Sequence, residues 1–297
     1  MVHQNVVNEF IAMQADGRVK SLNLAAQAMG ISSARLSTFL KGTYNGNVDE
    51  TAVIVNNYMS LVRERESVNT DDIEFINIKN SALVLDICRL THVQRTIALV
   101  IGRAGLGKTM ALKKYAADHP DCIYIEVDTA YSSRELLSEL HEICGYTGKG
   151  HLNKLKKEII KKLVGSGRLL IIDQAEYLPD RALDLLRTIH DKAGIGIVFA
   201  GLPRLLANIR GIGGIHEQLY TRIGAAAELE KLEEQDIQAL VNTYLPGAGL
   251  FKEFTEASRS NARVLYILAR ESKRIARNKK MNVNADIIRK ASKQLIH

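Results

Sequence analysis

The chain has 297 residues, of which 46% are hydrophobic and 25% charged, and these values are typical of a soluble globular protein. No apolar run reaches the length of a membrane span and no signal-peptide pattern opens the chain, so we expect a cytosolic protein without a membrane partner. The three cysteines are widely spaced, which excludes a disulfide framework and a zinc site. The formal net charge of +7 favours a polyanionic partner.

Residues 1–63 predict a small all-helical domain. Ala26 precedes Gly30 by four residues, Ile31 follows the glycine, and Ser32 or Ser33 can cap a second helix over 34–40. This is the spacing of a helix-turn-helix, in which a small residue lets two helices cross closely and the glycine makes the turn. A structural helical hairpin is the alternative. If the motif binds DNA, the side chains expected to be exposed toward a major groove are Ser33, Arg35, Ser37 and Thr38.

A further helix is expected over 47–63, followed by a polar linker over 64–72 that shows no periodicity. From residue 96 onward, apolar runs at 97–101, 122–127, 169–172, 195–200 and about 225–229 are strand-like, and helical patterns separate the first four. This alternation predicts that 73–232 form an α/β domain with a parallel sheet. Residues 233–297 have no strand signal and predict a small helical lid.

The segment Gly102–Thr109 fits the P-loop pattern G-x-x-x-x-G-K-[ST] in full, between an expected strand and an expected helix. Glycines let successive backbone N–H groups point at phosphate oxygens, and the helix presents its positive end to the same anion. Lys108 would reach the β- and γ-phosphates and Thr109 would bind Mg²⁺. The residues expected to contact the nucleotide are Gly102, Ala104, Gly105, Leu106, Gly107, Lys108, Thr109 and Met110.

The apolar run at 169–172 ends in Asp173, which is the Walker B pattern, and Asp173 would hold Mg²⁺ across from Thr109. Sites that hydrolyse nucleotides usually place a glutamate next, but this chain has Gln174. An amide can hold a water molecule but cannot take its proton. Glu176 is close in sequence, and we interpret it as a helix-start or contact residue. Nucleotide binding is therefore predicted, and hydrolysis stays open.

Positive charge is concentrated in two segments. Residues 252–297 carry twelve lysines or arginines and four acids, a net charge of +8. In the second segment, 149–162, basic residues recur at helical spacing opposite an apolar stripe of Leu152, Leu155, Ile159 and Leu163. Such a helix can simply present a solvated basic face, or it can bind DNA. The residues expected to contact DNA are Lys149, Lys154, Lys157 and Lys161.

Taken together, these features resemble the B-protein family of phage Mu, AAA+ ATPases that capture target DNA for transposition, and more distantly the TnsC- and IstB-type transposition ATPases. The resemblance is carried by 31–40 with Tyr44-Asn45-Gly46, by the P-loop, by 171–173 followed by Ala175, and by 194–201. The chain departs from the family at Gln174, where the family has glutamate, and at Leu202, where a polar sensor residue usually follows.

The resemblance implies an AAA+ fold and a bacterial host cell. It implies ATP bound with Mg²⁺ between subunits of a homo-oligomeric filament, which holds double-stranded DNA and recruits a transposase. Arg222, within 219–223, matches the arginine that acts on a neighbour's nucleotide, and Arg263, within 261–265, matches the sensor of the lid. The implied catalytic set is Lys108, Asp173, Gln174 and Arg222. The alternatives are a transcriptional regulator with an ATP switch and an ATP-locked DNA scaffold without useful hydrolysis.

Overall fold

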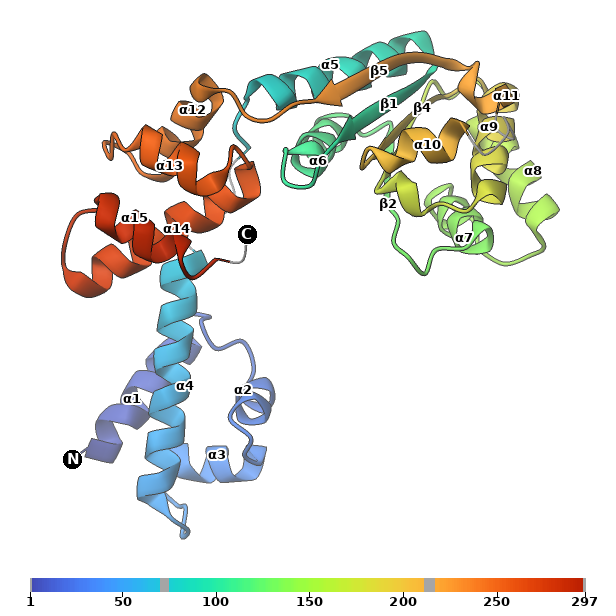
Figure 1. Cartoon of the computed structure of the whole chain (residues 1–297). Coiled ribbons are helices and arrows are strands. Elements are labelled where there is room, and N and C mark those ends of the chain that lie inside the picture. The colour runs from blue at the N-terminus through green and yellow to red at the C-terminus, as the bar shows by residue number, and fades with distance from the viewer. Residues whose placement is uncertain (1, 70–74, 211–216, 296–297) are drawn as a thin grey trace. The chain divides into compact units, whose positions relative to one another are not determined.

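The computed structural model describes residues 2–69, 75–210 and 217–295. The chain divides into two compact units, Met1–Glu74 and Phe75–His297, and Figure 1 shows their helices and strands. Within the described ranges, none of the helices combines the length and the apolar character that crossing a membrane requires.

The N-terminal unit consists of α1 (Val2–Ala15), α2 (Leu22–Ala28), α3 (Ser33–Leu40) and α4 (Val48–Asn69). Gly30 makes the turn between α2 and α3 with a φ of +68°, and the Ser32 hydroxyl caps α3 by accepting a hydrogen bond from the Arg35 N–H. Leu36 and Phe39 of α3 pack with Phe10 in one buried core. The predicted turn and cap are therefore present in the structure.

Helix α4 continues beyond the expected domain boundary. It ends at Asn69, so residues 64–69 of the predicted linker are helical, while 70–72 lie outside the described residues. The sequence predicts a linker here because apolar periodicity is lost after the expected helix. Arginine and glutamate in this segment have high helix propensity, so the helix can continue there without a buried face.

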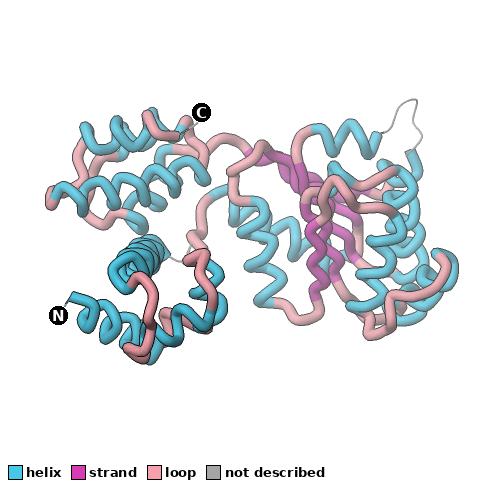
Figure 2. The backbone as a smooth tube through the Cα atoms, turned by 90° about the horizontal axis from the view of Figure 1, so that it is seen from below, coloured by secondary structure: helices cyan, strands magenta, loops and turns pink. Residues whose placement is uncertain are grey.

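The second unit is built on five parallel strands in the order β2-β3-β4-β1-β5. Figure 2 shows this sheet with helices around it. All five lie where the sequence predicts them, with the bounds β1 Ile97–Gly102, β2 Cys122–Glu126, β3 Leu169–Asp173, β4 Gly196–Gly201 and β5 Ile223–Leu229. Because every strand runs the same way, the loops that follow the strands gather at one edge of the sheet, called here the carboxyl edge.

Two cores lie on the two faces of the sheet, because side chains alternate along each strand. Ile97, Leu99 and Ile101 of β1 pack in one core and Ala98 and Val100 in the other. The second face is covered by α5 (Lys79–Gln94) and α6 (Lys108–Asp118). The first is covered by α7 (Ser133–Ile143), α8 (Leu152–Leu163), α9 (Asp180–Ala193), the short 3₁₀ helix η1 (Ala175–Tyr177), α10 (Arg204–Arg210) and α11 (Glu217–Tyr220).

The end of the chain forms a helical lid with its own core around Phe254, Leu265 and Ile288. Its elements are α12 (Glu234–Tyr244), α13 (Phe251–Ser258), α14 (Ala262–Lys279) and α15 (Ala285–Ser292). The described part of this segment contains helices and no strand, as the sequence predicts. Asn261 caps α14 by accepting hydrogen bonds from the N–H groups of Arg263 and Val264, and this cap brings the start of α14 to the P-loop.

Candidate functional site

The loop between β1 and α6 has a conformation suited to binding phosphate. Gly105 and Gly107 have φ values of +81° and +91°, in the left-handed region that side-chain-bearing residues rarely adopt. A Cβ on Gly105 would also lie 2.2 Å from the side-chain oxygen of Asn261. Leu106 is buried and anchors the loop in the core, whereas Met110 in the first turn of α6 is exposed. The positive end of α6 therefore begins beside a curled, glycine-containing loop.

Lys108 lies across this loop. Its Nζ donates hydrogen bonds to the carbonyl oxygens of Gly102 at 2.6 Å and Arg103 at 3.0 Å. Burial lowers the pKa of the Lys108 ammonium from its ordinary value, while the charges of Asp173 and Glu176 act in the opposite direction. The lysine is thus held in the loop, and the two carboxylates are close enough to act on its charge. A bound phosphate would complete the hydrogen bonds of its ammonium group.

Thr109 and Asp173 meet as the sequence predicts. The Thr109 hydroxyl donates to Asp173 Oδ2 at 2.7 Å, and Asp173 is only 1% exposed. The same Oδ2 accepts a hydrogen bond from the Tyr124 hydroxyl at 3.1 Å, and Oδ1 accepts one from the Gln174 N–H at 2.9 Å. A hydroxyl and a carboxylate are the oxygen ligands that Mg²⁺ prefers, so the pair fits this metal. Bound there, Mg²⁺ would neutralise charge on the β- and γ-phosphates.

Gln174, which follows the Walker B aspartate, adopts a left-handed backbone with a φ of +56°. Its side chain is directed to the end of β2, where Nε2 donates to Glu126 Oε1 at 2.7 Å. The other oxygen of Glu126 accepts hydrogen bonds from Lys113 Nζ at 2.9 Å and from the Tyr124 hydroxyl at 3.2 Å. The Lys113 ammonium holds the pKa of Glu126 below its ordinary value, with smaller help from Gln174 and Tyr124.

Glu126 is the member of this site that the sequence reasoning missed. It is paired with Asp173 in the register of β2 and β3, so the two carboxylates end neighbouring parallel strands. That position is the available signal, because a residue ending a strand next to the Walker B strand must lie at the carboxyl edge. No motif marks it.

Glu176 lies in η1 and is buried, with a side chain that is 3% exposed. Its Oε2 accepts a hydrogen bond from the Leu202 N–H at 3.2 Å, and its Oε1 lies 4.0 Å from Arg204 Nη2. A Cβ on Gly201 would lie 2.2 Å from Oε2, so the glycine at the end of β4 makes room for this carboxylate. Glu176 therefore links η1 to the loop that follows β4.

The lid meets the P-loop through the start of α14. Asn261 Nδ2 donates to the Ala104 carbonyl at 2.9 Å, and the Ala262 N–H donates to the Gly105 carbonyl at 2.9 Å. Arg263 is exposed next to this contact, and its charge contributes to the lowered pKa of Lys108, which places both cations near one point. A cavity of about 560 Å³ lies between the loop and the lid, lined in part by Gly102–Ala104, 228–231 and 258–261.

Arg222 lies away from the P-loop of its own chain. It directly precedes β5, so it is at the edge of the sheet opposite the P-loop of its own molecule. Its Nε is paired with Asp191 Oδ1 at 2.5 Å, and its Nη1 donates to the Gln218 carbonyl. Arg222 therefore takes no part in the nucleotide site of its own chain.

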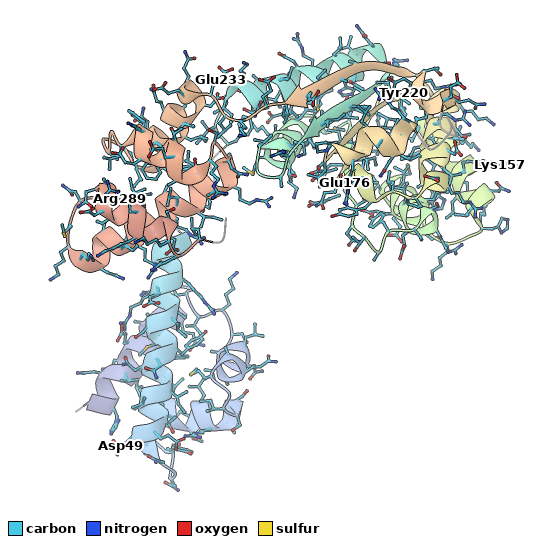
Figure 3. The ribbon with its side chains drawn as sticks, viewed as in Figure 1. Asp49, Lys157, Glu176, Tyr220, Glu233 and Arg289 are labelled. Carbon is cyan, nitrogen blue, oxygen red and sulfur yellow. The ribbon has the colours of Figure 1, made fainter. Side chains whose placement is uncertain are left out.

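The basic helix α8 has the two faces that the sequence predicts. Leu155, Ile159 and Leu163 are buried, while Lys154, Lys157 and Lys161 are exposed. Figure 3 shows Lys157 on the ribbon of α8. Lys149 is exposed but lies in the segment before α8, so the prediction that it continues the helical spacing is wrong. The glycines at 148 and 150, both with positive φ, explain why the helix begins only at Leu152.

The prediction of an exposed row on α3 is also wrong. Arg35 is half buried and is turned toward α4, where Nη2 donates to the Thr51 hydroxyl at 2.9 Å and lies 3.4 Å from Glu50 Oε2. Its guanidinium also lies 5.6 Å from the centre of the Tyr44 ring. The other three residues of the row are half buried, and the Thr38 hydroxyl donates to the Ala34 carbonyl at 2.8 Å. For Arg35, the contacts with Thr51 and Glu50 of α4 explain the difference.

A P-loop after the first strand, an acid at the end of the third, parallel strands in this order and a helical lid define the P-loop fold of the AAA class. Residues 91–209 match the AAA domain family. The fold is similar to that of the ORC2 protein of Aeropyrum pernix, with a TM-score of 0.59 at 15% identity over 78% of this chain and 73% of that one. It is also similar to RuvB of Thermotoga maritima, with a TM-score of 0.51 at 18% identity over 75% and 70%.

Sequence relatives narrow this class to one family. The Mu-like prophage FluMu DNA transposition protein B of Haemophilus influenzae is 30% identical over 252 residues, covering 80% of this chain and 85% of that protein. The ATP-dependent target DNA activator B of Escherichia phage Mu is 24% identical over 273 residues, covering 90% and 87%. The chain belongs to the family of Mu-like DNA transposition protein B.

Proposed function

We propose that this protein binds ATP with Mg²⁺ and, in that state, holds double-stranded DNA as the target of a transposase. The observation that carries the proposal is the convergence of Lys108, Thr109 and Asp173 at the carboxyl edge, with Thr109 and Asp173 2.7 Å apart. The phage Mu relative is named an ATP-dependent target DNA activator, which supports the link from nucleotide to DNA. Lys108 would bind the terminal phosphates, and Thr109 and Asp173 would hold the metal.

In this proposal ATP assembles subunits into a filament. The position of Arg222 supports it, because an arginine at the far edge of the sheet can reach a terminal phosphate only in a neighbouring molecule. Arg222 would leave Asp191 and bind the neighbour's γ-phosphate. Arg263, beside Lys108, would contact the same phosphate group from within its own chain. Gly102 to Met110 would line the phosphate end of the site, as the motif predicts.

DNA would be held through its phosphate backbone. Lys154, Lys157 and Lys161 form an exposed basic row on α8, and Lys149 adds a cation just before it. Contacts of this kind carry little sequence information, so we expect weak sequence preference and a steep dependence on salt. Among the predicted contact residues of α3, Ser33, Ser37 and Thr38 would contribute phosphate or base contacts, while Arg35 would orient α3 from its place against α4.

A transcriptional regulator is the second candidate, and the turn from α2 to α3 favours it, because Gly30 and Ser32 give these two helices the connection of a helix-turn-helix. Such a protein would read an operator with α3 and use ATP as a switch. The two candidates differ in sequence preference and in assembly.

Electron microscopy of the protein with arbitrary duplex DNA, with and without ATP, tests the proposal. We expect filaments on any duplex that form only with ATP and that a Lys108→Ala variant does not form. Gel shifts on several unrelated duplexes at two salt concentrations provide the second measurement. Tight binding to one sequence with no assembly on other DNA would reject target capture and support the regulator. Stimulation of strand transfer by a cognate transposase would test the last step.

A further inference from the structure

Two residues at the carboxyl edge differ from expectation. Gln174 is an amide at the position where a glutamate is expected, and Glu126 is an acid at a position that no motif marks. Gln174 follows Asp173 and has no group that can take a proton from water. Glu126 ends the neighbouring strand in register with Asp173, and the Gln174 side chain is hydrogen-bonded to it at 2.7 Å. The two side chains therefore form an acid–amide pair directly beside the Thr109–Asp173 pair.

Glu126 is connected to the metal ligands through one side chain. The Tyr124 hydroxyl lies 3.1 Å from Asp173 Oδ2 and 3.2 Å from Glu126 Oε2. The phenol hydroxyl therefore lies between the two carboxylates, within hydrogen-bond distance of both. The Glu126 side chain is 37% exposed, so water has access to it.

Glu176 is the competing carboxylate, and unlike Glu126 it is buried. One of its oxygens binds the Leu202 N–H, the other lies beside Arg204, and the side chain is 3% exposed. A buried carboxylate that holds two loops together serves as a structural contact. Glu126 instead meets solvent at the edge where nucleotide would bind.

We propose that Glu126 is the catalytic residue that orients the attacking water for ATP hydrolysis, and that Gln174 positions Glu126. The proposal rests on the proposed function, because it requires ATP at the P-loop. The water oxygen forms a bond to the γ-phosphorus while the bond from that phosphorus to the bridging oxygen of ADP breaks. The water's proton goes to the Glu126 carboxylate and then to solvent, leaving ADP and phosphate.

Lys113 has a defined part in this arrangement. Its ammonium lies 2.9 Å from Glu126 Oε2 and lowers the pKa of that carboxyl below its ordinary value. In phosphoryl transfer most of the catalytic effect comes from positioning and charge stabilisation, so a weakly basic but well-oriented carboxylate is sufficient. Removal of Lys113 should raise the pKa of Glu126.

The first test compares Glu126→Gln with Glu176→Gln in the full chain. Phosphate release is measured in single-turnover experiments, with binding of a fluorescent ATP analogue and ATP-dependent DNA binding measured in parallel. We expect Glu126→Gln to lose about 100-fold in turnover, a typical contribution of a base, with nucleotide binding unchanged. Glu176→Gln should retain more turnover than Glu126→Gln. Loss in Glu176→Gln with full turnover in Glu126→Gln would overturn the proposal and assign the role to Glu176.

The second test exchanges the pair. The double variant Glu126→Gln with Gln174→Glu again has one acid and one amide, at exchanged positions. We expect its turnover to be at least about tenfold higher than that of Glu126→Gln, which is a small part of what a positioned base contributes. If the double variant is no faster than Glu126→Gln, Gln174 and Glu126 do not act as a pair and the proposal fails.

The pH profile provides a measurement that a purely structural role would not change. The parent should lose turnover at low pH as Glu126 is protonated, and Lys113→Met should move that loss to higher pH. An unchanged profile in Lys113→Met overturns the proposal. If the parent turns over ATP no faster than Lys108→Ala, the proposal for Glu126 is also overturned. The proposed function would still stand in that case if the protein forms filaments with ATP.

Discussion

The P-loop and the basic face of α8 both offer positive charge to an anion, but they are built differently. At the P-loop, Lys108 is half buried, bonded to two carbonyls and set in a loop of fixed glycine conformations. On α8, the cations of Lys154, Lys157 and Lys161 lie on exposed, flexible side chains above a buried apolar stripe. The first arrangement selects one ligand geometry, and the second attracts any polyanion. Removal of one residue should therefore have very different effects in the two regions.

Lys108→Ala should produce the largest effect. Removing the cation that is placed for the terminal phosphates should weaken ATP binding by roughly 100-fold, because hydrogen bonds to charged groups are each worth about 1.5–3 kcal/mol. Titration with a fluorescent ATP analogue measures this loss. Lys114→Ala is the matched control, since Lys114 is an exposed lysine on the same helix, paired with Asp118. Equal losses in the two variants would show that the P-loop has no special role.

Removing Lys154, Lys157 and Lys161 together should have the next largest effect. Binding to unrelated duplexes should weaken evenly, and the dependence of log affinity on log salt should flatten by about 0.9 for each lost phosphate contact. Fluorescence anisotropy at several salt concentrations measures the slope. ATP affinity in the absence of DNA should not change. An unaltered slope would show that the basic row of α8 is only a solvated surface.

Arg35→Ala should have a smaller, local effect. The variant loses the hydrogen bond to Thr51 and the ion pair with Glu50, and we expect about 1 kcal/mol less stability in the N-terminal unit. Hydrogen exchange of the α3 amides should accelerate accordingly, with exchange in α6 unchanged. A change in preferred DNA sequence without faster exchange would instead show that Arg35 contacts bases.

Lys157→Ala alone should have the smallest effect, roughly two- to threefold in DNA affinity, because one exposed charge contributes about 0.2–1 kcal/mol. Lys192→Ala, at an exposed position in the last turn of α9, is its control. A loss from Lys157 as large as that from Lys108 would contradict the comparison, since a single cation on α8 would then act as a specific site. Competition gel shifts resolve effects of this size.

The same contrast explains what the sequence could predict. The five strands, the P-loop and the contact between Thr109 and Asp173 follow from backbone patterns, because apolar runs form the sheet and parallel strands bring their ends together. The position of Glu126 at the carboxyl edge follows from the same patterns, but its contacts with Gln174 and Lys113 do not, since an exposed acid at a strand end belongs to no motif. The burial of Arg35 depends on Thr51 and Glu50 of another helix, and helix periodicity alone does not reveal such a partner.

The place of Arg222 has a further consequence for the proposed assembly. Each molecule presents its phosphate loop on one edge of the sheet and Arg222 on the opposite edge. Two such molecules cannot satisfy both sites by a two-fold arrangement, because each contact joins unlike surfaces. In the proposed filament the molecules would therefore stack head to tail, with a free loop at one terminus and a free arginine at the other. The polymer is then polar, its two ends add and lose subunits differently, and the coated DNA acquires a direction that its own sequence does not supply.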